Sequence, residues 1–290
     1  YEGIEWGRWE SFPEYMDYIA SRRYSLDIGA QIAHGSLRYY VMGERGRMNE
    51  EATPDDLRQM SQLVTEAVQA GALGFSTSRT IGHRALDGSP VPGTFAPDQE
   101  LSAIADAMAR AGRGVFEMIP AGTVGKLERL GGERTTPEAE VELMADFSRQ
   151  SGRKVTFTLV QSPDYAPDTW ERLLDMVVSA NQTGAQLYPQ VSSRPIGLAS
   201  GLSGYHAFQR RPTYMKLAHL SLADRAREMA KPEIKAAIMS ETDVLVDQPG
   251  SMANMYQLFQ TAAMFLYPLA DPVDYEPDPS EMLGSRAAAT

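Results

Sequence analysis

Polar side chains follow several short apolar segments, at the points where an α/β enzyme would place its chemistry. The clearest segment is Gly71–Ser78, which comes after a long helical pattern and ends in Ser76, Thr77 and Ser78. In α/β proteins with parallel strands, the carboxyl ends of the strands line the pocket. We expect these three hydroxyl groups to bind substrate. A nucleophilic serine needs a sharp G-x-S-x-G turn, and Gly74–Ser78 supplies only the first half of that pattern.

A carboxylate interrupts the next apolar segment. Glu117 lies within Val115–Ile119, and burial of a charge there is costly unless the carboxylate is paired or bound to a metal. We therefore predict that Glu117 is catalytic and that it binds a metal, transfers a proton or orients the substrate. The alternative is a structural salt bridge, for which Arg194 would be the partner.

Two amides and a guanidinium follow the later strand-like segments. Gln161 and Gln190 end successive segments, and Arg194 comes shortly after the second. Such groups at neighbouring strand ends can orient an acyl or carboxylate group. We predict Gln161 and Gln190 as catalytic-site residues and Arg194 as a substrate-binding residue. The alternative is that they only support the residues that contact the substrate.

Histidine supplies weaker candidates. His34 precedes a short helical segment, and Arg38 lies one turn later, where it could bind a substrate carboxylate. The alternative is that His34 caps or supports that helix. His83 lies in a polar loop that could line the pocket mouth, while His206 and His219 are expected to pack. The four histidines do not have the spacing of a metal-binding motif.

Composition limits the possible partners. The chain has 27 basic and 38 acidic residues, a net charge of −11, which disfavours a nucleic acid or an anionic membrane as partner. It has no cysteine, which excludes disulfides, thiolate metal ligands and a cysteine nucleophile within these 290 residues. This composition suits a reducing compartment, and we expect the cytoplasm. Both ends lie within patterned sequence, so we expect an internal piece of a longer chain.

Helical and strand-like patterns alternate, which predicts a parallel sheet. Because the strand-like segments are apolar on both faces, we expect helices on both sides of it. The expected helices cover Ser11–Arg22, Ser36–Met42, the segment from Thr53 to Gly71, Pro97–Ala111, Thr136–Gln150 and Asp168–Ala180. The expected strands cover Leu26–Ile32, Gly71–Ser78, Val115–Ile119, Val155–Val160 and Gln186–Val191.

Two folds fit this alternation, an open doubly wound sheet and a (β/α)₈ barrel. The glycines of Gly71–Gly74 precede a strand, which is the wrong context for a dinucleotide-binding turn. Polar residues after each strand fit the ring of a TIM barrel better. We predict an incomplete (β/α)₈ barrel with its central part in residues 1–193. Residues 194–271 are expected to form a lid-like insertion over the mouth of the barrel, with short helices at Leu222–Ala230 and Pro232–Ser240. Residues 272–290 are expected to return to the barrel, which is truncated there.

Several stretches, taken in order, resemble the N-acyl-D-amino-acid deacylase (D-aminoacylase-like) branch of the amidohydrolase superfamily. The stretches are Trp9–Tyr15, Ala33–Arg38 through Val41–Gly43, Gly71–Ser78, and Asp87–Gly88 with Val91–Ala96. The resemblance implies a zinc-dependent (β/α)₈ barrel that hydrolyses a linear amide, with an N-acyl amino acid as the small-molecule substrate. Zinc would polarise the carbonyl and activate a water molecule.

The chain departs from this family in its metal ligands. The family's His-x-His pair, its bridging cysteine and its late catalytic aspartate do not appear here. The strand ends that often carry metal-binding histidines read Phe116–Met118 and Thr158–Gln161. We therefore expect zinc ligands mostly outside this segment. Two other functions stay open, another amidohydrolase such as a hydantoinase type, and a barrel without metal chemistry that acts as a binding protein.

Overall fold

The computed structural model describes residues 5–85, 89–128, 131–162, 164–193, 201–204 and 206–244. The chain divides into two compact units. The first comprises Tyr1–Ala85 and Pro90–Pro195, and the second comprises Leu86–Ser89 and Ile196–Thr290. The predicted site residues that the structure describes all belong to the first unit.

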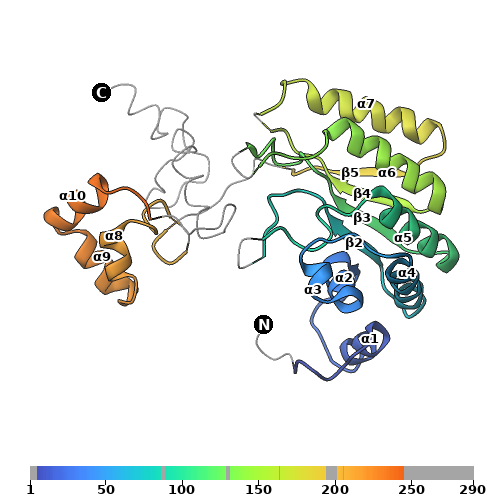
Figure 1. Cartoon of the computed structure of the whole chain (residues 1–290), viewed down its shortest axis with the longest axis horizontal. Helices are drawn as coiled ribbons and strands as arrows, with labels where there is room; N and C mark the ends of the chain where they lie inside the picture. The colour runs from blue at the N-terminus through green and yellow to red at the C-terminus, as the bar shows by residue number, and fades with distance from the viewer. Residues whose placement is uncertain are drawn as a thin grey trace. The chain divides into compact units, whose positions relative to one another are not determined.

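The first unit is built on a five-stranded parallel sheet whose strands follow one another in chain order. Each later strand pairs with the strand before it, and helices connect them (Figure 1). The strands are β1 (Ile32–Ala33), β2 (Gly74–Ser78), β3 (Val115–Ile119), β4 (Lys154–Thr158) and β5 (Leu187–Gln190). The helices are α1 (Phe12–Ala20), α2 (His34–Met42), α3 (Glu44–Arg47), α4 (Pro54–Gln69), α5 (Asp98–Ala111), α6 (Pro137–Ser151) and α7 (Thr169–Gln182).

Local sequence signals explain where the long helices begin and end. Thr53 caps α4 through a reciprocal capping box with Asp56, and Pro54 occupies the first turn. Thr136 caps α6 in front of another proline. Left-handed glycines end two helices, Gly112 after α5 and Gly152 after α6. These were the predicted helix boundaries, within one or two residues.

Parallel strands in chain order require crossovers of one hand, so their helices lie on the same face of the sheet. Helices α4, α5, α6 and α7 pack in succession along that face. The buried side chains of the strands, such as Phe75, Phe116 and Phe157, join helix side chains in one core. The expectation of helices on both faces is therefore wrong for the described helices. The winding is that of a barrel segment rather than a doubly wound sheet, and closure into eight strands stays a prediction.

Four of the five predicted strands are shorter in the structure, and the first two differ most. The segment Leu26–Ile32 contributes only its last residue, because β1 is confined to Ile32–Ala33 and pairs with β2 at Phe75 and Ser76. The earlier side chains are not packed, and Leu26 is 76% exposed. Strand β2 begins at Gly74 rather than at Gly71.

The second unit contributes three short helices to the described structure: α8 (Pro212–Leu217), α9 (Leu222–Met229) and α10 (Pro232–Ser240). Helices α9 and α10 were predicted, and α8 was not. His206 and Tyr214 are buried and their rings meet edge to face, with centroids 4.5 Å apart. Residues 272–290 and Arg194 lie outside the described residues. No described helix has the length and hydropathy needed to cross a membrane.

Candidate active site

The second face of the sheet carries a row of polar residues across three strands. Backbone pairing places Ser76 of β2 beside Glu117 of β3, and Glu117 beside Thr156 of β4. Neighbouring strands lie about 4.8 Å apart, so one carboxylate stands between two hydroxyl groups. All three residues are half-buried, whereas their sequence neighbours on the helix side are fully buried. We call Ser76, Glu117 and Thr156 the Glu117 row.

Gln190 is joined to this row by a hydrogen bond. Its amide Nε2 donates to the Thr156 hydroxyl at 3.0 Å, and that hydroxyl donates to the carbonyl of Tyr188 at 3.1 Å. Gln190 also pairs with Thr158 in the register of β4 and β5. The amide of Gln190 is thus held at Thr156, the neighbour of Glu117 in the sheet.

Glu117 has no ion-pair or hydrogen-bond partner for its carboxylate among the residues that the structure describes. The alternative reading, a structural salt bridge to Arg194, involves a residue outside the described ranges and stays untested. A half-buried carboxylate beside hydroxyl donors can accept hydrogen bonds from a substrate or take up a proton. The Glu117 row is therefore the best candidate for chemistry in the first unit.

The residues of this row do not by themselves fit a zinc ion. Zinc sites use three or four ligands from histidine, cysteine, aspartate and glutamate. Across the described ranges, no group of three or more such side chains comes together. Glu117 has serine and threonine as its neighbours on either side. The role of Glu117 as a metal ligand remains a prediction. A zinc ion bound there would need further ligands from outside the row.

Alternation along β2 separates the three predicted hydroxyl residues. Ser76 and Ser78 share the face of the Glu117 row, while Thr77 points to the helix face and is buried. The Thr77 hydroxyl lies 2.8 Å from Nδ1 of His34. Ser78 instead contacts His83, with 2.8 Å between its hydroxyl and Nδ1 of the exposed imidazole. Only Ser76 and Ser78 are therefore placed to meet a substrate on the face of Glu117.

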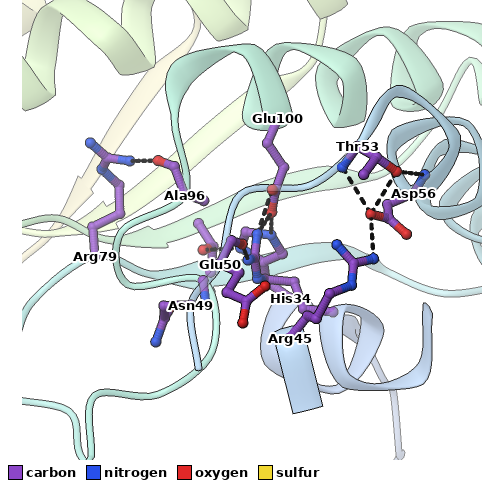
Figure 2. A network of polar contacts seen from close by, with 12 residues as sticks. His34, Arg45, Asn49, Glu50, Thr53, Asp56, Arg79, Ala96 and Glu100 are labelled. Carbon is purple, nitrogen blue, oxygen red and sulfur yellow. Dashed lines mark hydrogen bonds and ion pairs between the residues drawn. The ribbon is translucent and has the colours of Figure 1, made fainter. Parts of the chain in front are cut away.

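His34 and Arg38 belong to a buried network centred on Glu100 of α5. Nε2 of His34 lies 2.7 Å from a Glu100 carboxylate oxygen, and the Arg38 guanidinium binds the same carboxylate and the carbonyl of Glu50. Figure 2 shows Glu100 pointing from its helix towards His34. His34, Arg38 and Glu100 are at most 1% exposed. The carboxylate that binds Arg38 is thus the side chain of Glu100. The substrate-binding roles of His34 and Arg38 remain predictions.

The charges in this network can be assigned from burial. Burial lowers the pKa of His34 below its ordinary value, against the opposing effect of Glu100. Burial would raise the pKa of Glu100, but the hydrogen bonds from His34 and Arg38 and the charge of Arg38 outweigh it, and the pKa is lowered. A neutral His34 then donates from Nε2 to Glu100 and accepts at Nδ1 from Thr77. The ion pair of the network is that of Arg38 with Glu100.

Sequence reasoning missed a second buried carboxylate, Glu140 of α6. It binds Nε of Arg79 at 2.9–3.0 Å and accepts the backbone N–H of Ala121 at 3.2 Å. Arg79 also donates to the carbonyl of Ala96 at 2.9 Å. This ion pair ties the residue after β2 to the start of α6. Neither Glu100 nor Glu140 could be recognised beforehand, because acidic residues in a first helical turn are common at solvent-exposed positions.

Gln161 does not join the Glu117 row. It lies three residues beyond the end of β4, where it is exposed and lines a separate cavity beside α6 and α7. The structure thus brings Ser76, Glu117 and Gln190 together through Thr156 and places Gln161 elsewhere. The catalytic roles of all of them remain predictions.

Comparisons with known proteins find similar structures only. No protein-family model and no curated protein sequence matches the chain. An N-acyl-D-glutamate deacylase from Bordetella bronchiseptica, complexed with zinc and a phosphonate mimic of the tetrahedral intermediate, matches 64% of this chain at 20% identity and a TM-score of 0.49. A D-aminoacylase described as defining a novel subset of amidohydrolases matches 62% at 17% identity and a TM-score of 0.47. The chain covers 34% and 33% of those two proteins, about a third of their length.

Proposed function

We propose that this chain is the central part of an amidohydrolase that cleaves a linear amide bond in a small N-acylated amino acid. The ordered stretches that resemble the N-acyl-D-amino-acid deacylase branch support the substrate class. The observation that carries the proposal is the Glu117 row, a half-buried carboxylate between two hydroxyl groups on the sheet face opposite the helices, unpaired among the residues that the structure describes.

Amide hydrolysis needs a base for the attacking water and donors for the carbonyl oxygen. In the proposed reaction, Glu117 accepts a proton from water as its oxygen attacks the carbonyl carbon. The hydroxyl of Ser76 donates to the oxygen on which negative charge develops, while the Thr156 hydroxyl keeps its hydrogen bond to the carbonyl of Tyr188. The C–N bond then breaks, and the proton held by Glu117 passes to the leaving amine. No step is assigned to zinc, because the described residues do not form its site.

A hydrolysis assay tests the proposal. The protein expressed from its full reading frame is incubated with matched N-acetyl-D- and N-acetyl-L-amino acids, and release of the free amine is measured. We expect hydrolysis of at least one substrate class. Loss of that activity with a chelator and its return with zinc would indicate ligands beyond the described residues. Saturable binding without turnover would contradict the proposal in favour of the binding-protein alternative.

A further inference from the structure

A cavity of about 430 Å³ lies between β4, α6 and α7 of the first unit. Its floor is formed by buried side chains of the core, namely Val141, Met144, Phe157 and Leu173. Phe157 is on the helix face of β4, opposite to Thr156 of the Glu117 row. None of Ser76, Glu117, Thr156 and Gln190 lines the cavity, which is therefore distinct from the site proposed above for hydrolysis.

Two aromatic side chains and two loops form the walls. Tyr165 and Trp170 are half-buried, and residues 120–123 after β3 and 159–162 after β4 complete the wall. Gly122 belongs to the first of these loops at a φ of 78°, and a Cβ on it would lie 2.7 Å from the Tyr165 hydroxyl. The absence of a side chain at Gly122 thus leaves room for the tyrosine to line the cavity.

All residues that line this cavity are uncharged. A charged ligand would lose its hydration there without an ion-pair partner among the lining residues, which is costly. A volume of this size and an apolar lining with a few polar groups are typical of small-molecule sites. Aromatic and methionine side chains also favour contact with a flat ring.

Two polar groups can fix the orientation of such a ligand. Burial raises the pKa of the Tyr165 phenol, so its hydroxyl stays protonated and can donate a hydrogen bond. The side-chain amide of Gln161 at the rim can both donate and accept. Together they match a ligand amide, whose carbonyl accepts and whose N–H donates.

We propose that this cavity is a binding site for an uncharged aromatic amide, with the ring between Tyr165 and Trp170 and the amide at Tyr165 and Gln161. The site does not depend on the hydrolysis proposed for the Glu117 row. It also gives Gln161 a binding role in place of the catalytic role expected from the sequence.

Trp170 provides the signal for a direct test. The chain has three tryptophans, and the other two are Trp6 and Trp9. The double variant Trp6→Phe/Trp9→Phe leaves Trp170 as the fluorescent reporter of the cavity. Benzamide, benzoate and benzylamine are titrated as probes, because they share a ring and differ in charge. We expect a saturable change with benzamide and at least tenfold weaker binding of the two charged probes.

Two substitutions test the location. Ala166→Phe, at an exposed position lining the cavity, should weaken benzamide binding at least tenfold, whereas Ala230→Phe on an exposed position of the second unit should not change it. Tyr165→Phe removes only the hydroxyl that donates the hydrogen bond and should weaken benzamide binding about threefold. This variant tests the location of the site if Ala166→Phe does not fold. Circular dichroism checks folding.

No saturable signal, equal binding of all three probes, or equal effects of the matched variants would overturn the proposal. Binding is measured without turnover, so its failure and that of the hydrolysis proposal are distinguishable.

Discussion

Glu117 of β3 and Thr156 of β4 are direct neighbours in the sheet, and the Thr156 hydroxyl is held by the amide of Gln190 at 3.0 Å. A carboxylate, a hydroxyl and an amide from three consecutive strands thus meet on one face. Helices α4 to α7 pack on the other face, and Ser76, Glu117 and Thr156 are half-buried on this one. Substitutions can test both the buried network that positions this sheet and the chemistry assigned to its polar face.

Removing the charge of Glu100 should strongly destabilise the first unit. In Glu100→Gln, the buried guanidinium of Arg38 loses its counterion, and breaking a buried pair in this way costs about 3–5 kcal/mol. Urea unfolding measures the free energy of unfolding. The matched change Glu142→Gln, at an exposed position of α6, should stay within about 0.5 kcal/mol of the parent. Equal effects of the two changes would refute a central role for Glu100.

The same network predicts lower stability in acid. His34 has a pKa below its ordinary 6.5 and Glu100 below its ordinary 4.5, so both bind fewer protons in the folded state than in the unfolded state. The stabilisation by His34 should be present above about pH 6.5 and decline as pH falls below it, followed by that of Glu100 below about pH 4.5.

Thermal or urea unfolding between pH 7.5 and 4 checks this order. His206 also has a pKa lowered by burial and Glu140 a pKa raised by burial, so comparing His34→Gln with its parent in a His206→Gln background isolates the contribution of His34. In that background, stability should still fall between pH 7 and 5.5. A flat or rising stability over this interval would show that His34 is not buried in its neutral form.

Gly74 should not tolerate a side chain. A Cβ there would lie 1.8 Å from the carbonyl oxygen of Val115, so Gly74→Ala must push β2 away from β3. We expect a loss of more than about 2 kcal/mol, in the range of overpacked sites. Gly201→Ala is the matched control, because a Cβ added there would meet no atom within 4 Å. Native-like stability of Gly74→Ala would contradict the strand pairing.

Local signals made most of the fold of the first unit predictable. The Thr53–Pro54 start of α4 and the apolar run Val115–Ile119 each define one element almost to the residue. Alternation predicted the parallel sheet, and the polar strand ends favoured a barrel, in which strands follow one another in chain order as they do here. The strand predicted for Leu26–Ile32 was too long. An apolar segment forms a strand only where a neighbouring strand pairs with it and a core packs against it.

The candidate site was predictable only in part. Glu117 was found because a carboxylate in an apolar strand is unusual, and Gln190 because it ends a strand. Thr156 was missed, since a threonine within a strand is ordinary and its importance comes from the register with Glu117. His34 and Arg38 were recognised as unusual, but their partner Glu100 lies 66 and 62 residues away. Such long-range pairing has no local signal.

The charge of Glu117 is the central requirement of the proposed hydrolysis. Glu117→Gln keeps the size of the side chain and removes the base, and Glu142→Gln is the matched change on an exposed helix position. Amide hydrolysis by the protein from its full reading frame should fall roughly 100-fold or more in Glu117→Gln, with unchanged folding by circular dichroism. The Glu142→Gln variant should retain full activity. Hydrolysis at the parent rate in a folded Glu117→Gln variant would contradict the assignment of Glu117 as the base.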